Sequence, residues 1–318
     1  MDIIYFPETA NRAQPCKTVA GKKSEAIATV GFFDGVHLGH RHVITMLRQM
    51  AEERGLVSTV ITFERHPRQV LCSDWQPKLL TTLEEKTALI EETGVERLVV
   101  LRFDRLMAAL TARAFMEQVL LKELDVRVLV TGYDNRFGHN RSEGFDDYVR
   151  YGREIGMDVV AGTPLTLSDV TTVSSSVVRR LLDSGNASAA ARCLGRPYSI
   201  SGKVVSGQHI GTEMGFPTAN LLPKEPLKLI PKAGAYAVEA NGHPAMMNIG
   251  TRPTFDGQGQ TLEVHLLDYE GNLYGQELTV RFLHWLREER RFDSREALVA
   301  QLQRDAAKAR KLLSITPY

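Results

Sequence analysis

The stretch that most constrains the fold runs over residues 26–40 and reads AIATVGFFDGVHLGH. Its first part, Ile27 to Val30, is short, apolar and partly β-branched, which is typical of a buried strand. Three glycines and an Asp-Gly pair then allow a tight turn, and from His40 to Arg54 the apolar residues recur with helical spacing. A strand, a glycine-rich turn and a helix start predict an anion-binding site, because free N–H groups and the positive end of the helix dipole face the same point.

Two histidines, His37 and His40, stand three residues apart in this turn. Across a helix start both rings can point the same way and donate N–H groups to phosphate oxygens. Two other interpretations stay open at this point: a structural glycine turn with solvated histidines, and a paired-histidine zinc site. The preceding strand and the glycines favour phosphate, and no nearby cysteine or carboxylate cluster offers the further ligands that zinc needs. The Walker lysine is absent from the turn.

The length and composition of the chain limit the classes of function. A chain of 318 residues predicts about two domains, and a net charge of +1 gives no reason to expect a nucleic-acid or membrane partner. We also expect no obligate protein partner. Three widely separated cysteines, no apolar run of membrane-spanning length and no secretory pattern at the N-terminus predict a cytoplasmic protein.

Residues 1–184 alternate strand-like and helix-like segments, which predicts a parallel, doubly wound α/β sheet. The predicted strands are Ile27–Val30, Val57–Thr62, Arg97–Leu101, Val126–Val130 and Met157–Val160. The predicted helices after the first one are Leu83–Thr93, Thr111–Leu124 and Phe145–Ile155. In such a sheet the ligand lies outside the carboxyl ends of the strands, where the histidine turn begins.

Two later segments of this domain add polar groups. After the fourth strand, a turn with a glycine at either end carries Asp134 and Arg136, although an ordinary strand-to-loop turn is an equal alternative. Further on, Ser174 to Ser176 precede a short helical pattern. The simplest interpretation is a serine-capped helix; the functional one adds that the hydroxyls, the free N–H groups and Arg179 converge on a helix start that suits a polyphosphate.

A small, polar, glycine-punctuated stretch from Asp183 to Pro197 marks the domain boundary, so that the second domain is 185–318. Its short strands and turns predict a small antiparallel β-barrel followed by one amphipathic helix. The predicted strands are Ile200–Ser206, Ala235–Ala240, Ala245–Ile249, Thr261–Leu267 and Leu278–Phe282. The pairs Asn241-Gly242 and Glu270–Asn272 are predicted to be hairpin turns.

Three polar residues of the barrel are candidates for chemistry. Pro217 removes a ladder donor, which leaves the oxygens of Thr218 and Asn220 on one side of an extended chain as possible ligands to Mg²⁺. A turn with polar caps is the alternative. Glu263 lies mid-strand between apolar neighbours, either as an outward-facing residue of a half-solvated sheet or as a general base.

The segment GFFDGVHLGH at 31–40 resembles the signature of bacterial bifunctional riboflavin kinase/FMN adenylyltransferases, also called FAD synthetases. GFPTAN at 215–220 resembles the riboflavin kinase motif, and family-like segments follow in the expected order to about residue 313. The resemblance implies a Rossmann-like nucleotidylyl transferase domain and a barrel with a terminal helix. It also implies ATP and Mg²⁺, the phosphorylation of riboflavin to FMN, and the adenylylation of FMN to FAD with release of pyrophosphate.

The resemblance implies a role for each motif residue. The residues implied in catalysis are His37, His40, Arg179 and Glu263, the last as base for the ribityl 5′-hydroxyl. The residues implied in nucleotide and phosphate binding are Gly31, Phe33, Asp34, Gly35, Gly39, Ser174, Ser175, Ser176, Gly202, Lys203 and Gly215. Those implied in flavin binding are Asp134, Arg136 and Arg287. Those implied in binding magnesium and ATP are Thr218 and Asn220.

The chain departs from the family pattern at a few positions. Asn135 stands where the family usually has Phe, Ser176 replaces a Thr, and Thr172 and Thr212 stand where basic residues are common. A lost cation near a polyphosphate would raise the KM for ATP or slow phosphoryl transfer. Two other functions are therefore weighed: a nucleotidylyl transferase for another phosphate with the barrel as a substrate-holding appendage, and a flavin sensor whose kinase site has decayed.

Overall fold

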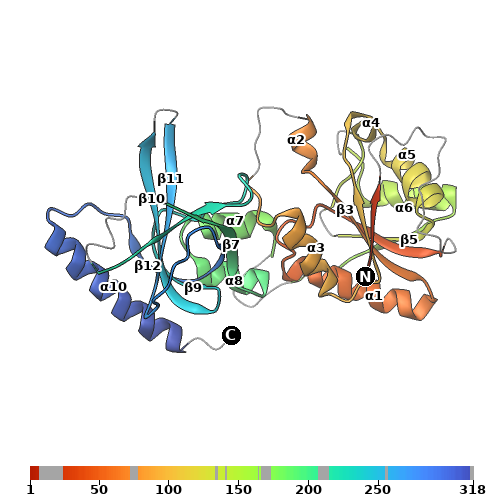
Figure 1. Cartoon of the computed structure of the whole chain (residues 1–318). Helices are drawn as coiled ribbons and strands as arrows, with labels where there is room; N and C mark the ends of the chain where they lie inside the picture. Colours follow the sequence, from red (N-terminus) through yellow and green to blue (C-terminus); the bar gives the residue numbers. More distant parts are fainter. Residues whose placement is uncertain are drawn as a thin grey trace. The chain divides into compact units, whose positions relative to one another are not determined.

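The structure is a computed structural model that describes residues 1–6, 24–71, 78–132, 135–139, 142–163, 165, 173–206, 215–254 and 257–315. The chain divides into two compact units, Met1–Val173 and Ser174–Tyr318, each described by itself below (Figure 1). The helix that follows Ser174 therefore groups with the second unit, whereas the sequence analysis assigned it to the first domain.

The first unit is built on a six-stranded parallel sheet with the order β1-β4-β3-β2-β5-β6. The strands are β1 (Asp2–Phe6), β2 (Ala26–Val30), β3 (Val57–Phe63), β4 (Arg97–Leu101), β5 (Val126–Thr131) and β6 (Asp158–Ala161). The predicted α/β fold is confirmed, and the predicted strands agree within one residue at each end; β1 was not predicted. The strand order reverses at β2, so the carboxyl end of β2 lies at a switch point, where ligands of open α/β sheets bind.

Helices cover both faces of this sheet, as Figure 1 shows. One face packs against α1 (Leu38–Arg54) and α3 (Leu83–Glu91), and the other against α5 (Ala112–Ala114), η1 (Phe115–Glu123) and α6 (Phe145–Ile155). Two short helices, α2 (Pro67–Leu71) and α4 (Arg105–Ala108), complete the described elements. The predicted helix Thr111–Leu124 forms, but most of it is the π-helix η1.

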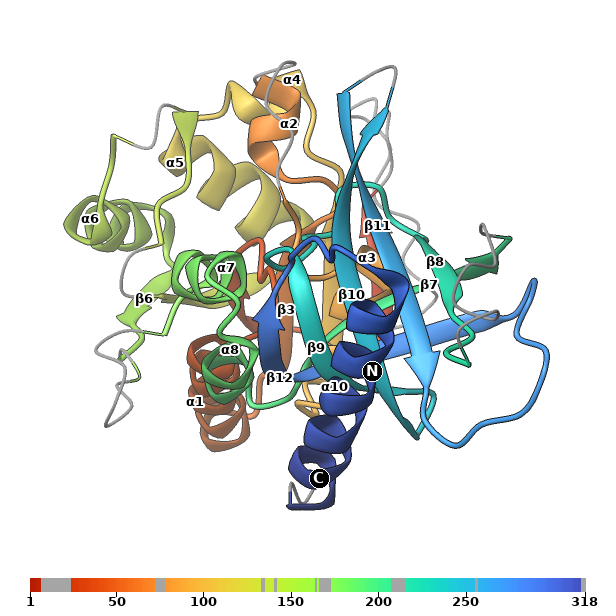
Figure 2. The same ribbon diagram turned by 90° about the vertical axis from the view of Figure 1, so that its left-hand side faces the viewer.

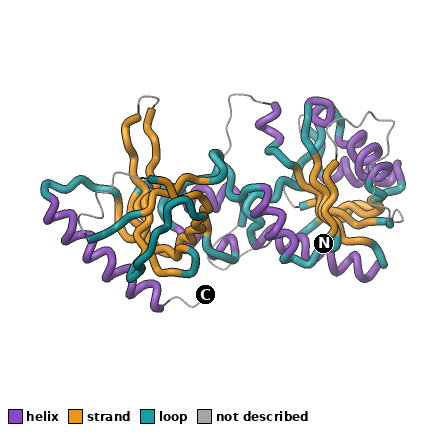
Figure 3. The backbone as a smooth tube through the Cα atoms, in the orientation of Figure 1, coloured by secondary structure: helices purple, strands orange, loops and turns teal. Residues whose placement is uncertain are grey.

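The second unit begins with α7 (Ser175–Asp183) and α8 (Ala187–Leu194) and continues into a closed antiparallel barrel, which confirms the predicted architecture. The barrel strands are β7 (Tyr198–Val205), β8 (Ala219–Pro223), β9 (Gly234–Ala240), β10 (His243–Thr254), β11 (Gly257–Leu266) and β12 (Glu277–Glu288), in the order β10-β11-β8-β7-β12-β9. β8 was not predicted. Figure 3 shows these strands, in orange, gathered together in the second unit.

One of the two predicted hairpin turns is correct. Asn241 and Gly242 both have left-handed backbone, with φ of 47° and 84°, and join the paired strands β9 and β10. The prediction for Glu270–Asn272 is wrong: both edges of β11 are taken by β10 and β8, so the chain leaves for β12, which pairs with β7 and β9.

The last helix, α10 (Arg295–Ile315), lies along the outer surface of the barrel (Figure 2). Its small and apolar face buries Ala306, Ala309 and Leu313 against Ala237 and Met246 of the barrel. This packing fits the amphipathic helix that the sequence predicts after the barrel. None of the helices that the structure describes combines the length and the hydropathy that a membrane span requires.

Candidate active sites

The turn after β2 holds three residues in left-handed backbone: Phe33 (φ 53°), Gly35 (φ 82°) and Val36 (φ 38°). Such an angle is unusual for any residue with a side chain and an outlier for a β-branched one such as Val36. Both Phe33 and Val36 are buried, so packing holds them in place. Strained backbone of this kind persists only where the surroundings enforce it, and it is concentrated at functional sites.

The enforcing contacts come from the segment before α3. The buried carboxylate of Asp34 accepts hydrogen bonds from the backbone N–H groups of Leu80 (3.0 Å) and Thr81 (3.1 Å) and from the Thr81 hydroxyl (3.3 Å). The Thr81 hydroxyl in turn accepts from the N–H of Gly35 at 3.0 Å. These bonds give Asp34 and Gly35 a bracing role, while their direct contact with phosphate stays a prediction.

The two histidines lie together at the start of α1. His37 is the N-cap residue, and its Nδ1 accepts from the His40 N–H at 3.2 Å. The two rings stack with centroids 3.6 Å apart and planes 19° from parallel, while Phe33 packs edge-on against His40 at 5.1 Å. The structure thus brings together both predicted histidines and the predicted Phe33.

The geometry favours neutral imidazoles. Burial, followed by the proximity of His37 and then of Lys86, holds the pKa of His40 well below its ordinary value of 6.5. Because His37 Nδ1 accepts a hydrogen bond, we assign its proton to Nε2. Nδ1 of His40 is buried and has no hydrogen-bond partner among the residues that the structure describes. At neutral pH the pair therefore offers N–H dipoles to an anion.

Glycine is required where the histidines approach the backbone. A Cβ at Gly39 would lie 3.1 Å from the carbonyl oxygen of Val173 and 3.2 Å from the ring of His37, and a Cβ at Gly31 would lie 3.1 Å from the ring of Phe33. Both contacts are tighter than side-chain carbons normally make. The glycines of the motif thus let the turn close over the end of β2.

The turn after β5 contributes a residue whose role the sequence analysis missed. The side-chain amide of Asn135 donates to the carbonyl of Val30, the last residue of β2. Asn135 was noted only as a departure from a usual Phe, and nothing in its neighbourhood in the sequence indicates a partner 105 residues away. Arg136 is exposed, and Asp134 lies outside the described residues.

The serine segment forms the predicted helix start in the second unit. Ser174 is the N-cap of α7, and its side chain accepts from the Val177 N–H at 3.3 Å. Ser175 and Arg179 are partly buried, and Ser176 is exposed. Their participation in a site with His37 stays a prediction.

The second candidate site is a row of polar residues on neighbouring barrel strands. Glu263 of β11 lies directly opposite Asn220 of β8 on one side and Asn248 of β10 on the other. Directly opposite residues point to the same face of a sheet, with Cβ atoms roughly 5 Å apart. Because the neighbours of Glu263, Leu262 and Val264, are buried in the barrel, Glu263 faces outward.

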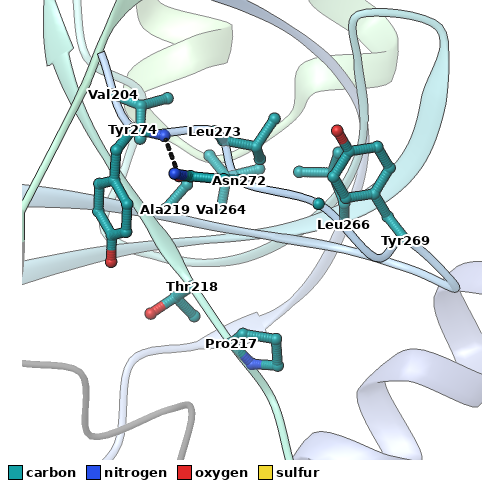
Figure 4. A pocket seen from close by; sticks show the side chains of 11 residues that line it. Val204, Pro217, Thr218, Ala219, Val264, Leu266, Tyr269, Asn272, Leu273 and Tyr274 are labelled. Atoms are coloured by element: carbon teal, nitrogen blue, oxygen red, sulfur yellow. Dashed lines mark hydrogen bonds between the residues drawn. The ribbon is translucent and has the colours of Figure 1, made fainter. Parts of the chain in front are cut away.

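A pocket of about 400 Å³ is lined by Thr218, Ala219 and Val264, on the strands that carry this row, but Asn220, Asn248 and Glu263 are not among its lining residues. Thr218 lies on its wall, with the rings of Tyr269 and Tyr274 on either side (Figure 4). The Tyr274 N–H donates to the Asn272 side chain at 2.9 Å, which shapes the loop at the rim. A second, wider pocket of about 900 Å³ shares Pro217 and Tyr269 with the first. The motif GFPTAN thus lies along both pockets.

Gly250 and Glu289 also belong to this face, and the sequence analysis missed both. A Cβ at Gly250 would lie 2.9 Å from the Thr261 hydroxyl, 3.1 Å from Glu289 Oε1 and 3.5 Å from the amide nitrogen of Asn248. Three polar groups converge there only because position 250 has no side chain. The sequence did carry one signal, a glycine inside a strand pattern, which often marks a place where other groups come close to the backbone.

Two family models match the chain in succession. The one described as FAD synthetase matches residues 20–177, and the one described as riboflavin kinase matches residues 194–313. A bifunctional riboflavin kinase/FMN adenylyltransferase of Escherichia coli (strain K12) is 40% identical over 297 residues, covering 91% of this chain and 93% of that protein. The chain belongs to this bifunctional family.

Further relatives of the same description extend over nearly the whole chain. The bifunctional riboflavin kinase/FMN adenylyltransferase of Bacillus subtilis (strain 168) is 34% identical over 322 residues, covering 96% of this chain and 98% of that protein. A solved structure described as a macrolide-efflux protein from Streptococcus pneumoniae superposes with a TM-score of 0.85 at 28% identity, covering 98% of this chain and 99% of that one. The two-unit fold is therefore shared across the full length.

The family implies a magnesium ion, and two donors of the GFPTAN segment suit it. Thr218 and Asn220 offer a hydroxyl and an amide oxygen, the hard ligands that Mg²⁺ prefers. Mg²⁺ usually takes few protein ligands and completes its shell with substrate phosphates and water. Within the described ranges, no group of three or more His, Cys, Asp or Glu side chains could hold a metal by itself.

The remaining predicted residues of the second unit have structural surroundings of their own. A Cβ at Gly202 would lie 2.3 Å from the Leu222 carbonyl oxygen, so β7 and β8 can pair closely only with glycine there. Lys203 is exposed beside it, and Gly215 is exposed with a φ of 77°. Arg287 Nε donates to the buried carboxylate of Asp305 at 2.7 Å. The nucleotide and flavin contacts of these residues stay predictions.

Proposed function

We propose that the second unit transfers the γ-phosphoryl group of ATP to riboflavin, and that the first unit adenylylates the resulting FMN to give FAD and pyrophosphate. Membership of the bifunctional family supports both reactions. One observation supports the assignment of one reaction to each unit. Glu263 lies in register with Asn220 in the second unit, and the stacked histidines lie in the first.

In the kinase reaction, Glu263 accepts the proton of the ribityl 5′-hydroxyl while that oxygen attacks the γ-phosphorus. The new P–O bond forms as the bond between the γ-phosphorus and the bridging oxygen of ADP breaks. The pocket beside Thr218 holds the ATP, and the oxygens of Thr218 and Asn220 would hold the magnesium ion. When bound, that ion neutralises charge on the phosphates.

In the adenylyl transfer, an oxygen of the FMN phosphate attacks the α-phosphorus of ATP, and the bond to the bridging oxygen of pyrophosphate breaks. The nucleophile is already an anion, so this step needs no general base. The main requirement is to stabilise the charge that develops on the leaving pyrophosphate. The N–H groups of His37 and His40, at a helix start, suit that task.

A pocket of about 330 Å³ at the carboxyl ends of β3 and β4 is our candidate for the FMN in this reaction. It lies on the same sheet edge as the histidine turn, since all six strands are parallel. Three of the seven residues that line it are arginines, which favour an anionic ligand: Arg65, Arg102 and Arg105. Both reactions are assigned to the cytoplasm, in line with the few, scattered cysteines.

The test is the chromatography of flavins after incubation with ATP and Mg²⁺. His37→Ala combined with His40→Ala should stop FAD formation while riboflavin is still converted to FMN. Glu263→Gln should stop FMN formation while supplied FMN is still converted to FAD. His42→Ala, on the exposed part of the same helix, and Glu277→Gln, an exposed strand glutamate, are the matched controls.

The outcome that would contradict the division of labour is a folded variant that loses both products. If the wild-type protein bound riboflavin, seen as quenched flavin fluorescence, but never phosphorylated it, the sensor hypothesis would replace the kinase. If riboflavin were neither bound nor converted while another phosphate was adenylylated, the barrel would be an appendage.

A further inference from the structure

Lys86 is a buried lysine that none of the steps above uses. It lies on α3 with only 3% of its surface exposed. Lysine is almost never this buried unless its charge is compensated. A methionine would fill the same volume with no desolvation penalty, so an ammonium at this place calls for an explanation.

The ammonium connects the ends of two neighbouring strands. Lys86 Nζ donates to the carbonyl of Phe32 at 3.1 Å and to the carbonyl of Phe63 at 2.9 Å. Phe63 is the last residue of β3, and Phe32 is the second residue after β2, at the start of the histidine turn. The same Nζ lies 4.1 Å from the centroid of the Phe32 ring, a cation–π contact. One side chain therefore fixes both the main chain and the ring of Phe32.

Lys86 also belongs to the electrostatics of the turn. Its charge is among the causes that hold down the pKa of His40, after burial and the proximity of His37. Burial lowers the pKa of Lys86 itself to about 8, against the opposing pull of the Asp34 carboxylate. His66 is a further titratable group on this side, and its ring packs edge-on against Phe32 at 4.7 Å.

We propose that Lys86 is a positioning residue for adenylyl transfer, which clamps the start of the histidine turn to β3 and places a positive charge beside the histidines. It acts through the turn and through His40. The inference rests on adenylyl transfer at this turn, as proposed above. It also assigns a role to the segment LTTLEEK at 80–86, for which the sequence spacing gave no chemistry.

The charge has a consequence that a purely structural lysine would lack. Because the ammonium loses its proton near pH 8 in the free enzyme, the attraction for a polyphosphate should weaken above that pH. The kcat/KM for ATP reports the ionisations of free enzyme, so it should fall on the alkaline side. Arginine at this position would stay charged throughout.

The experiment measures FAD formation from supplied FMN as a function of ATP concentration and pH. Lys86→Met should lower kcat/KM at pH 7 by about tenfold, the equivalent of one pKa unit of lost interaction, and should abolish the alkaline fall. Lys86→Arg should keep activity above pH 8, where the wild-type protein loses it. Lys122→Met, at an exposed lysine of the same unit, is the matched control.

One further measurement separates an electrostatic role of Lys86 from a structural one, and a second provides its control. The NMR titration of the His40 ring should show a higher pKa in Lys86→Met, because a nearby positive charge has been removed. FMN formation by the second unit serves as the internal standard for active protein.

The proposal is overturned if Lys86→Met keeps the wild-type kcat/KM, or if it loses activity while the alkaline fall and the His40 titration are unchanged. If Lys86→Met does not fold, Lys86→Arg decides: an alkaline fall that persists with arginine contradicts the proposal. The proposed function is judged separately, by whether the wild-type protein makes FAD and the combined His37→Ala and His40→Ala variant does not. That result does not depend on the outcome with the Lys86 variants.

Discussion

The hydroxyl of Thr81 is the most direct point at which to test the bracing of the histidine turn. It accepts from the buried Gly35 N–H at 3.0 Å and donates to the Asp34 carboxylate at 3.3 Å. Thr81→Val keeps the shape of the side chain and removes both bonds. We therefore expect a loss of stability in the first unit together with a loss of FAD formation.

The size of the stability loss in Thr81→Val follows from the polar groups that lose their hydrogen-bond partner. An orphaned buried N–H at Gly35 costs about 1–3 kcal/mol, and the longer bond to Asp34 contributes about 0.5–1 kcal/mol. The extra buried methyl group of valine offsets about 0.8 kcal/mol. The net destabilisation is about 2 kcal/mol, which for a unit of this size lowers Tm by roughly 4–8 °C.

Thr62→Val is the matched control, because it removes a buried hydroxyl at the same sheet edge. The Thr62 hydroxyl donates to the Phe32 carbonyl at 3.1 Å, but that oxygen still accepts from Lys86. Thr62→Val leaves no buried donor without a partner. The lost hydrogen bond and the gained methyl group therefore nearly cancel, and we expect almost no change in the free energy of unfolding.

The assay is urea unfolding monitored by hydrogen-exchange mass spectrometry, which follows peptides of each unit separately, with flavin chromatography on the same samples. Peptides of the first unit should lose protection at lower urea in Thr81→Val, while those of the barrel and FMN formation stay unchanged. The reasoning is refuted if the two valine variants differ by less than about 0.5 kcal/mol, or if Thr81→Val is destabilised and still forms FAD at the wild-type rate.

Three other predictions concern separate parts of the chain. Gly202→Ala should prevent close pairing of β7 with β8, because its Cβ would meet the Leu222 carbonyl at 2.3 Å; we expect a loss of more than about 3 kcal/mol, measured as lost barrel protection in hydrogen exchange. Asp305→Ala should destabilise the barrel by about 3 kcal/mol, since it leaves the partly buried Arg287 guanidinium without its carboxylate. Arg287→Met should cost at least as much, because it leaves the more deeply buried Asp305 carboxylate without its cation; urea unfolding of both variants measures the two losses. The pKa of His40 is lower in the folded unit than its unfolded value of 6.5. Below pH 6.5 the unfolded chain therefore binds a proton that the folded unit does not bind, and the free energy of unfolding falls. Between about pH 7 and 5, His40→Asn should lose less of its free energy of unfolding than the wild-type protein does.

The strand and helix pattern was largely predictable, because it depends on local periodicity. The predicted fourth helix of the first domain and α6 share the bounds Phe145–Ile155. The strand β1 was missed because it is a short edge element that pairs with β4, almost a hundred residues later in the sequence. The strand β8 was missed because prolines flank it, and proline normally argues against a strand.

The chemistry of the sites was predictable only where it depends on neighbours in the sequence. The spacing of His37 and His40 predicted a shared helix start, and the stacked rings confirm that they lie together. The bond from Asp34 to Thr81 and the clamp of Lys86 on Phe32 join residues 47 and 54 positions apart. Such contacts leave no periodic pattern, so sequence reasoning described Asp34 only as a motif residue and assigned no chemistry to Lys86.

The two nucleophiles explain why the two sites differ in their residues. The ribityl hydroxyl must lose a proton as it attacks, so a kinase site needs a base. Our candidate is the carboxylate of Glu263, which lies in register with Asn220. The FMN phosphate attacks as an anion, so a carboxylate aimed at it would only repel it. In the first unit the buried carboxylate of Asp34 is accordingly turned into the protein, saturated by N–H donors of Leu80 and Thr81. For this site we propose imidazoles instead: burial keeps His40 neutral, and His37 accepts a hydrogen bond at Nδ1. Neutral rings would stabilise the charge on the leaving pyrophosphate through their N–H dipoles.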